Sequence, residues 1–192
     1  MSTSPRFAIY YAPEPSHPLW SVGCDWLGRD PSRPEWRAPA RQATEAPRRY
    51  GFHATLKPPM ALPDGVSPEE FIAGVHALAA RWSRFEMPAL EVGVVQDFVA
   101  LRPVGPLGDA SPLRRLAEAC VQPATLPEDW QFHMTLSDPF PDDAAREQTL
   151  SDARRHFEAA LAQPLSCESL CVFTEPAEGE PFVLSHRLGF AR

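Results

Sequence analysis

A duplicated pattern of five residues restricts the fold of this sequence more than any other feature. Phe52-His-Ala-Thr-Leu56 is followed, 80 positions later, by Phe132-His-Met-Thr-Leu136. Each copy alternates apolar and polar residues as a half-buried strand does, and patterns for a helix and two strands follow each copy. The sequence therefore predicts an internal duplication, with units at about residues 48–104 and 129–190.

Local signals predict the other elements. The clearest helix start is Ser67-Pro-Glu-Glu70, where a serine N-cap, a proline in the first turn and a capping-box glutamate come together. Strands are expected near 7–11, 50–56, 90–95, 98–104, 131–137, 169–174 and 182–189, and helices near 19–27, 67–82, 111–121 and 142–161. The 23 prolines, well above the usual share of about 5%, indicate many firmly bounded loops.

The composition is that of an ordinary globular protein, and we expect one domain that covers residues 1–192. No apolar run reaches the roughly 18 residues of a membrane span, and the first residues lack a signal pattern, so we expect a cytoplasmic protein without a membrane partner. The formal net charge of -7 disfavours binding to long nucleic acid and favours a small phosphorylated substrate. Four cysteines without a Cys-x-x-Cys pair are expected to be reduced.

Two His-x-Thr pairs carry the chemistry that the duplication predicts. Residues i and i+2 of a strand share one face, so His53 lies beside Thr55 and His133 beside Thr135. If the two copies face one cleft, one imidazole accepts a proton from the attacking oxygen and the other donates a proton to the leaving oxygen. The threonines, with Lys57 on the same strand face, would bind the phosphate oxygens. This arrangement predicts phosphodiester cleavage with neither a metal ion nor another cofactor.

Other residues are weaker candidates for this site. Tyr10 is expected to face the cleft, with structural packing as the alternative. Arg48 and Arg49 either attract phosphate at the cleft entrance or are solvated loop charges. His186, on a late strand, could approach the cleft. His17, His76 and His156 lack a motif, and His76 and His156, which lie in predicted helices, are expected at the surface or its boundary.

Longer strings around the motifs resemble a known family. The two His-x-Thr motifs, each preceded by Phe and followed by Leu, are similar to those of the 2H phosphoesterase superfamily. Three strings are similar, more narrowly, to the branch of that superfamily encoded beside phosphonate-degradation genes (Arg6-Phe-Ala-Ile-Tyr-Tyr-Ala-Pro-Glu-Pro, Trp26-Leu-Gly-Arg-Asp and Arg48-Arg-Tyr-Gly-Phe-His-Ala-Thr-Leu-Lys-Pro-Pro). The resemblance covers most of the chain, although segment 120–130 is shorter than in that branch.

The resemblance implies an α+β fold of two pseudo-symmetric lobes, each an antiparallel sheet with helices on its outer face, and a catalytic cleft between them. It places His53, Thr55, His133 and Thr135 on the catalytic positions of the superfamily. Characterised members act on cyclic phosphates or 2'-5' phosphodiester bonds, and for this branch the resemblance implies a small cyclic sugar phosphate. The expected function is that of a metal-independent cyclic phosphodiesterase, in phosphonate breakdown or in RNA processing.

Two other interpretations of the motifs remain open. A non-catalytic protein would use the cleft to bind a phosphorylated metabolite or an RNA end, and turnover separates it from an enzyme. A metallohydrolase would use His53 and His133 as metal ligands, but the sequence has no His-Glu-x-x-His motif or carboxylate cluster beside them. The sequence does not say which histidine is the base.

Overall fold

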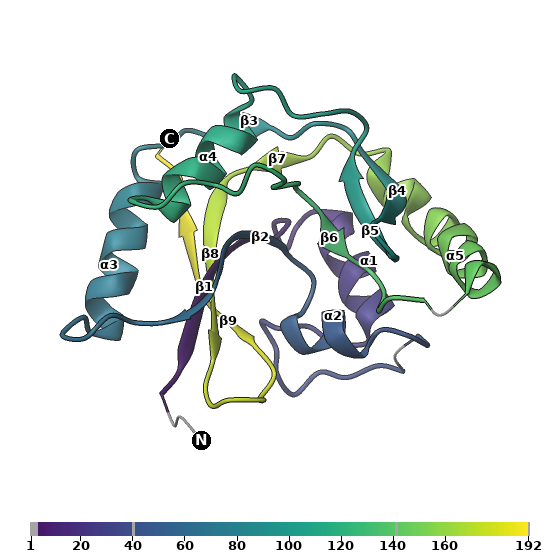
Figure 1. Cartoon of the computed structure of the whole chain (residues 1–192), viewed down its shortest axis with the longest axis horizontal. Helices are drawn as coiled ribbons and strands as arrows, with labels where there is room; N and C mark the ends of the chain where they lie inside the picture. The colour runs from purple at the N-terminus through teal and green to yellow at the C-terminus, as the bar shows by residue number, and fades with distance from the viewer. Residues whose placement is uncertain (1–3, 40, 141, 192) are drawn as a thin grey trace.

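Two antiparallel sheets form the framework of the protein in the computed structural model, which describes residues 4–39, 41–140 and 142–191 (Figure 1). The larger sheet has the order β2 (Ala54–Ala61), β1 (Arg6–Tyr11), β8 (Ser169–Glu175) and β9 (Val183–Gly189). The smaller sheet has the order β4 (Leu90–Val95), β5 (Phe98–Pro103) and β6 (Met134–Thr135), and β3 (Phe85–Glu86) pairs with β7 (Ser166–Cys167). The predicted α+β class with antiparallel sheets is confirmed. The ends of the expected 1–192 domain, residues 1–3 and 192, lie outside the described ranges.

Each of the two main sheets combines strands from both halves of the chain. β2, which follows His53, lies in one sheet with β8 and β9, which come after the second motif copy. β6, which follows His133, pairs with β5, which comes after the first copy. β2 and β6 contact each other, so the two motif strands meet where the sheets adjoin. The two-lobe pseudo-symmetry and the units at 48–104 and 129–190 stay predictions.

Helices pack on both sheets (Figure 1). α3 (Pro68–Ala79) packs against β8 and β9, and α4 (Pro112–Val121) packs against β2. α1 (Pro18–Leu27) packs against α5 (Asp143–Leu161), which also contacts β4 and β5, and the short α2 (Glu45–Tyr50) leads into the first motif. Prolines in the first turns of α1, α3 and α4, and the capping box between Ser67 and Glu70, explain where these helices begin.

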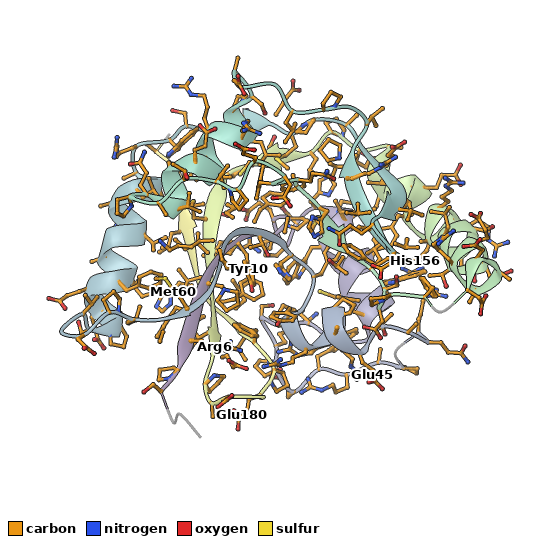
Figure 2. All side chains as sticks on the ribbon, in the orientation of Figure 1. Arg6, Tyr10, Glu45, Met60, His156 and Glu180 are labelled. Carbon is orange, nitrogen blue, oxygen red and sulfur yellow. The ribbon has the colours of Figure 1, made fainter. Side chains whose placement is uncertain are left out.

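The two faces of the larger sheet have different neighbours. On one face, the ring of Phe7 in β1 packs 5.5 Å from the ring of Phe71 in α3. Arg6 and Tyr10 of the same strand project to the other side, toward α2, while Met60 of β2 lies on the side of α3 (Figure 2). The face toward α2 is therefore the one that carries the first motif.

The first motif copy packs on α1 and α5, and the second copy is hydrogen-bonded to α1. The Phe52 ring is stacked 6.0 Å from the ring of Phe157 in α5 and lies directly against Gly23 of α1. Nε1 of Trp26 in α1 donates a hydrogen bond to the carbonyl of Leu136 at 2.7 Å. Burying a large apolar side chain contributes about 1.5–3 kcal/mol, so Phe52 anchors the first copy, and the Trp26 hydrogen bond ties the second copy to the same helix α1.

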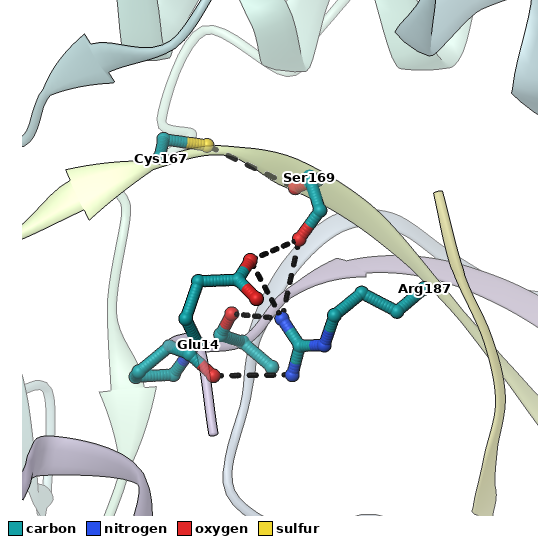
Figure 3. Close-up of polar contacts among 6 residues, drawn as sticks. Glu14, Cys167, Ser169 and Arg187 are labelled. Carbon is teal, nitrogen blue, oxygen red and sulfur yellow. Dashed lines mark hydrogen bonds and ion pairs between the residues drawn. The ribbon is translucent and has the colours of Figure 1, made fainter. Parts of the chain in front are cut away.

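A partly buried network of polar side chains joins the ends of β1, β8 and β9 (Figure 3). Arg187 donates hydrogen bonds to the carbonyls of Ala12 and Pro13, and to Oε1 of Glu14 at 3.1 Å. Ser169 donates to the same carboxylate oxygen at 2.5 Å and accepts from Arg187 at 3.2 Å. Charge-assisted hydrogen bonds of this kind fix geometry, so the network holds the end of β1 in place.

The structure corrects the first motif strand, which was predicted over 50–56. Tyr50 ends helix α2 because Gly51, with φ of 84°, turns the chain in a conformation that glycine adopts without strain. β2 begins later and continues through Pro58 and Pro59. It is an edge strand of its sheet, where a residue without a backbone N–H is tolerated.

The second motif strand, predicted over 131–137, is also shorter, because only Met134 and Thr135 pair with β5. Helix α2 and the pair β3 and β7 were not predicted. α2 has only six residues with Pro47 inside it, and two-residue strands have no alternation to detect. The other predicted strands and helices are found at the expected places.

Candidate functional site

Both motif histidines are anchored through the same backbone contact. Nδ1 of His53 lies 2.8 Å from the carbonyl oxygen of Gly51, and Nδ1 of His133 lies 2.9 Å from the carbonyl oxygen of Gln131. A carbonyl oxygen only accepts, so Nδ1 carries the hydrogen in each ring. Nε2 is left to accept a proton or, when the ring is charged, to donate one. The two copies therefore present equivalent nitrogen atoms.

The motif threonines lie on the same strand face as the histidines. Thr55 Oγ1 is 3.3 Å from Nε2 of His53. Thr55 and Thr135 are half-buried, while the residues on either side of each threonine are buried (Ala54, Leu56, Met134 and Leu136). The predicted separation of an apolar face from a polar face is observed in both copies.

The ring of His53 is enclosed by aromatic side chains. Tyr10 is stacked on it at 3.8 Å between ring centroids, and Tyr50 and Phe173 lie at 6.0 and 5.9 Å. Burial lowers the pKa of His53 to about 4; the hydrogen bond to Gly51 acts in the opposite direction, and the charge of His133 lowers the pKa further. The two imidazoles, 80 positions apart in the sequence, thus act on each other electrostatically.

The surroundings of His133 differ from those of His53. Its ring lies 5.5 Å from the ring of Phe98 in β5. The residue opposite Thr135 in the sheet is Ala100, whereas the residue opposite Thr55 is Tyr10. An alanine has no ring to stack on a neighbouring imidazole, so the His133 side of the site is less filled.

Tyr10 and Lys57, the lower-ranked candidates, have contrasting positions. Tyr10 contacts His53 but is 1% exposed, and burial raises the pKa of its hydroxyl well above the usual value. Lys57 is half-buried on β2, opposite Ile9. Burial raises the pKa of Cys120 in α4 to about 12, and the charge of Lys57 acts against that rise, which places the ammonium group near α4. Within the described part of the chain, neither side chain forms a hydrogen bond to a motif residue, and both stay candidates.

Arg48 and Arg49 lie in the last turn of α2, immediately before the first motif, and are not loop charges. Arg29, which is 2% exposed, donates hydrogen bonds to the carbonyls of both residues and to that of Phe182. A cation at the carboxyl end of a helix is favourable, so Arg29 fixes the chain that leads into His53. The side chain of Arg49 forms an ion pair with the buried Glu175.

The other histidines have structural surroundings. His186 is exposed on β9, an edge strand, opposite Val172. His17 caps α1 by accepting a hydrogen bond from the backbone N–H of Leu19, and His156 of α5 lies 3.0 Å from the carbonyl of Val22. The expectation that the motif sets His53 and His133 apart from them is consistent with this placement.

A charged cluster beside the first motif was missed by the sequence analysis. Arg6 of β1 and Arg49 of α2 both form ion pairs with Glu175 of β8, which is fully buried. Arg6 and Glu175 are 169 positions apart, so no local pattern connects them. The only available signal was a lone arginine immediately before the first predicted strand, 7–11.

A cavity of about 500 Å³ adjoins the second motif copy. Gln131 and Phe132 line it together with Trp130, Arg102 of β5 and Arg114 of α4. Its size is that of a small-molecule site. Neither motif histidine is among the lining residues, so the cavity lies beside the second motif copy and does not contain the reactive groups.

Three properties of residues 4–39, 41–140 and 142–191 bear on membranes, metal ions and disulfides. No helix in these ranges is long and apolar enough to cross a membrane. In the same part of the chain, no three histidine, cysteine or acidic side chains form a group that could hold a metal ion. The four cysteines are buried and free, as expected for reduced structural residues.

Comparison with known proteins gives a family and relatives. The family described as "Protein of unknown function (DUF1045)" matches residues 55–126 and 123–183. A protein of Laribacter hongkongensis (strain HLHK9) named "Ribose 1,5-bisphosphate phosphokinase PhnN" is 33% identical over 93% of this chain and 50% of its own length. A protein of Janthinobacterium sp. (strain Marseille) with the same name is 30% identical, over 97% and 51%. The chain thus spans about half the length of these relatives.

Proposed function

This chain belongs to the family described as "Protein of unknown function (DUF1045)", and we propose that it is a metal-independent phosphoesterase that opens a small cyclic phosphate or phosphodiester. The observation that carries the proposal is the matched pair of imidazoles, each held through Nδ1 by a backbone carbonyl and followed two residues later by a threonine. The resemblance of both motifs to the 2H phosphoesterase superfamily supports the same class of reaction.

In the proposed reaction His53 is the base and His133 is the acid. Because its pKa is about 4, His53 has an unprotonated Nε2 at neutral pH, while the second ring donates from the equivalent nitrogen. Water bonds to phosphorus and loses a proton to His53, and the ring P–O bond breaks as His133 protonates the leaving oxygen. The product is a phosphate monoester, and proton exchange with solvent restores both rings.

The motif threonines supply the remaining contacts in this proposal. The phosphorane-like transition state carries extra charge on its non-bridging oxygens, and hydroxyl donors aimed at those oxygens stabilise it. Thr55, 3.3 Å from Nε2 of His53, is close enough to the reacting atoms to do so, and Thr135 has the matching sequence position. Lys57 and Tyr10 are secondary candidates for phosphate contacts.

A phosphorylated sugar is the proposed class of substrate. Both relatives are named for action on ribose 1,5-bisphosphate, and the formal charge of -7 disfavours a long polyanion. The resemblance to the phosphonate-associated branch points in the same direction. We therefore propose a cyclic ribose phosphate formed during phosphonate breakdown.

A phosphokinase activity, which the names of the relatives would suggest, has less support in this chain. Those names describe proteins about twice as long as the matched region. The sequence contains no Gly-x-x-x-x-Gly-Lys-Ser/Thr loop, the usual cradle for nucleotide phosphates. We do not transfer the kinase activity to this chain.

Phosphorus NMR of the purified protein with ribose 1,2-cyclic phosphates and 2',3'-cyclic nucleotides tests the proposal. The cyclic phosphate signal is expected to be replaced by a monoester signal, at a rate that chelators do not change. Binding of these compounds with no product would instead identify a non-catalytic binder. Loss of turnover on chelation, with metal found in the purified protein, would favour the metallohydrolase.

The rate is expected to fall as the pH decreases through about 4. The base must be unprotonated, and His53, whose surroundings lower its pKa, becomes protonated only near that pH, below the usual range for histidine. A profile of kcat/KM against pH measures this limb, with circular dichroism at each pH to verify that the protein stays folded. An acidic limb near the ordinary histidine value of about 6.5 would contradict the assignment of His53 as the base.

A further inference from the structure

Helix α2, which leads into the first motif, depends on another part of the chain for its N-terminal cap. Thr44 holds the N-cap position, and its hydroxyl donates a hydrogen bond to the carbonyl of Arg41 at 2.8 Å. Among the residues that the structure describes, this hydroxyl forms no hydrogen bond to the first turn of the helix. A helix of six residues is too short to be stable by itself in water, so its first turn needs a partner from elsewhere.

Asp138, just after the second motif copy, is that partner. One oxygen of its carboxylate accepts a hydrogen bond from the backbone N–H of Glu45, and the other accepts one from the N–H of Ala46, both at 2.8 Å. The N–H of Asp138 donates in turn to the carbonyl of Ala43 at 2.7 Å. Pro47 has no N–H, so the two carboxylate oxygens satisfy both donors of the first turn, where a negative charge is also favourable.

The segment that carries Asp138 is held firmly beside the second motif strand. The hydroxyl of Ser137, a residue that is 1% exposed, accepts a hydrogen bond from the N–H of Val99 at 2.9 Å. The N–H of Leu136 donates to the carbonyl of Val99 at 2.8 Å. In Figure 1, the chain after β6 runs toward α2. The carboxylate therefore has a fixed place relative to the second motif copy.

The other end of α2 is tied to the ring of His53. The N–H of Gly51 donates to the carbonyl of Pro47 at 2.9 Å, and the carbonyl of Gly51 accepts a hydrogen bond from Nδ1 of His53 at 2.8 Å. Arg29 donates to two carbonyl groups of the last turn. The helix is thus a short, supported connection between the Asp138 carboxylate and the carbonyl that orients the imidazole.

This carboxylate has no counterpart in the first copy of the motif. At the duplication offset of 80, Asp138 corresponds to Pro58, whose side chain has no hydrogen-bond acceptor. The acid is therefore not part of the repeated pattern. A residue present in one copy alone fits a contact that is needed once, between the second copy and the helix that precedes the first.

We infer that Asp138 is a positioning residue for His53, which acts through α2 by fixing the carbonyl that orients the imidazole and so sets the place of that ring relative to His133. A displacement of about 1 Å in a reacting group can cost about 10²-fold in rate. Both oxygens of Asp138 bind the helix, so in this scheme the residue does not contact the phosphate. The inference rests on the proposed function, in which His53 is the base.

Asp138→Ala is expected to lower kcat by about 10- to 100-fold with KM nearly unchanged, because it misplaces the base without removing a contact to the substrate. In proton NMR, the His53 ring should titrate above the pH of about 4 expected for the wild type and closer to about 6.5, because a loosened α2 lets water reach the ring. The titratable groups around that ring are retained in the variant (Tyr10, Tyr50 and His133).

Asp142→Ala is the matched control. Asp142 caps α5 through the N–H of Ala145 at 2.8 Å, and α5 follows both motifs in the chain. Both alanine variants should lower the melting temperature by roughly 2–4 °C, the shift expected when a helix cap is lost from a chain of this size. Only Asp138→Ala should change kcat and the His53 titration. Wild-type values of both in Asp138→Ala would overturn the inference and make Asp138 an ordinary helix cap.

Two further comparisons separate the possible failures. Asp138→Asn keeps one acceptor oxygen but directs an NH2 group at the other N–H, so it should show smaller changes in the same direction. If the alanine variant does not fold, this variant decides, and wild-type behaviour in it would overturn the inference. The NMR titration requires no turnover. If the wild type opens no cyclic phosphate, the phosphoesterase proposal fails, whereas a shifted His53 titration in the variants would still support positioning by Asp138 and an unshifted one would overturn it.

Discussion

Replacing His53 or His133 with glutamine is expected to lower kcat by about 10²- to 10⁴-fold, because a general acid or base contributes a factor of this size. Glutamine keeps a polar side chain at each position but cannot take up or deliver a proton at neutral pH. Both rings serve one proton-transfer sequence, so the double variant should be far less impaired than the product of the two single losses. Initial rates with the cyclic substrate measure all three variants.

His186→Gln is the matched control for these variants. It removes an imidazole of the same size from β9, where the ring is exposed and outside the motifs, and it should leave kcat unchanged. The pH profiles separate the roles, since His53→Gln should lose the acidic limb and His133→Gln the basic one. Full activity in either motif variant, with normal folding, would contradict the mechanism.

Gly23→Ala is expected to destabilise the protein by about 1–3 kcal/mol or more, a cost typical of overpacking a well-filled core. A Cβ on Gly23 would lie 2.2 Å from a ring atom of Phe52. That ring is fully buried and stacked on Phe157, so it has no free space to move into. Phe52 immediately precedes His53, and the substitution should therefore lower activity as well. Urea unfolding and initial rates measure the two effects.

Gly74→Ala gives the opposite expectation at a comparable helical site. A Cβ there meets no atom within 4 Å, and the residue is exposed in α3. Alanine loses less freedom on folding than glycine, so this variant should be more stable by about 0.5–1 kcal/mol. Equal changes in the free energy of unfolding of the two variants would show that a clash with Phe52 is not the reason why position 23 requires glycine.

The sequence was informative wherever a signal was local. Ser67 and Glu70 form the capping box that their spacing predicts, and Asp142 caps α5 through the backbone N–H of Ala145. The alternation around Thr55 gave the correct buried and exposed faces of β2. In each of these cases the physical cause lies within a few residues.

Features that depend on distant partners could not be predicted. Gly51 ends helix α2, which the sequence did not reveal because Pro47 lies inside it. The backbone before each histidine is not part of the strand, and its carbonyl oxygen holds Nδ1 of the ring. The ion pairs of Glu175 join three elements far apart in the chain. Likewise, the sequence showed two motif copies but not that their strands belong to sheets completed by the other half.

This interchange of strands has a consequence for how the chain can be divided. A fragment that ends after β5 would contain His53 and β1 but would lack β8, to which β1 pairs from Arg6 to Tyr10. A fragment that begins after β5 would contain His133 on a strand with no neighbour. Neither piece can assemble even its own histidine site, so the two parts of the chain are not independent folding units, and synthesis must reach β8 before the larger sheet closes.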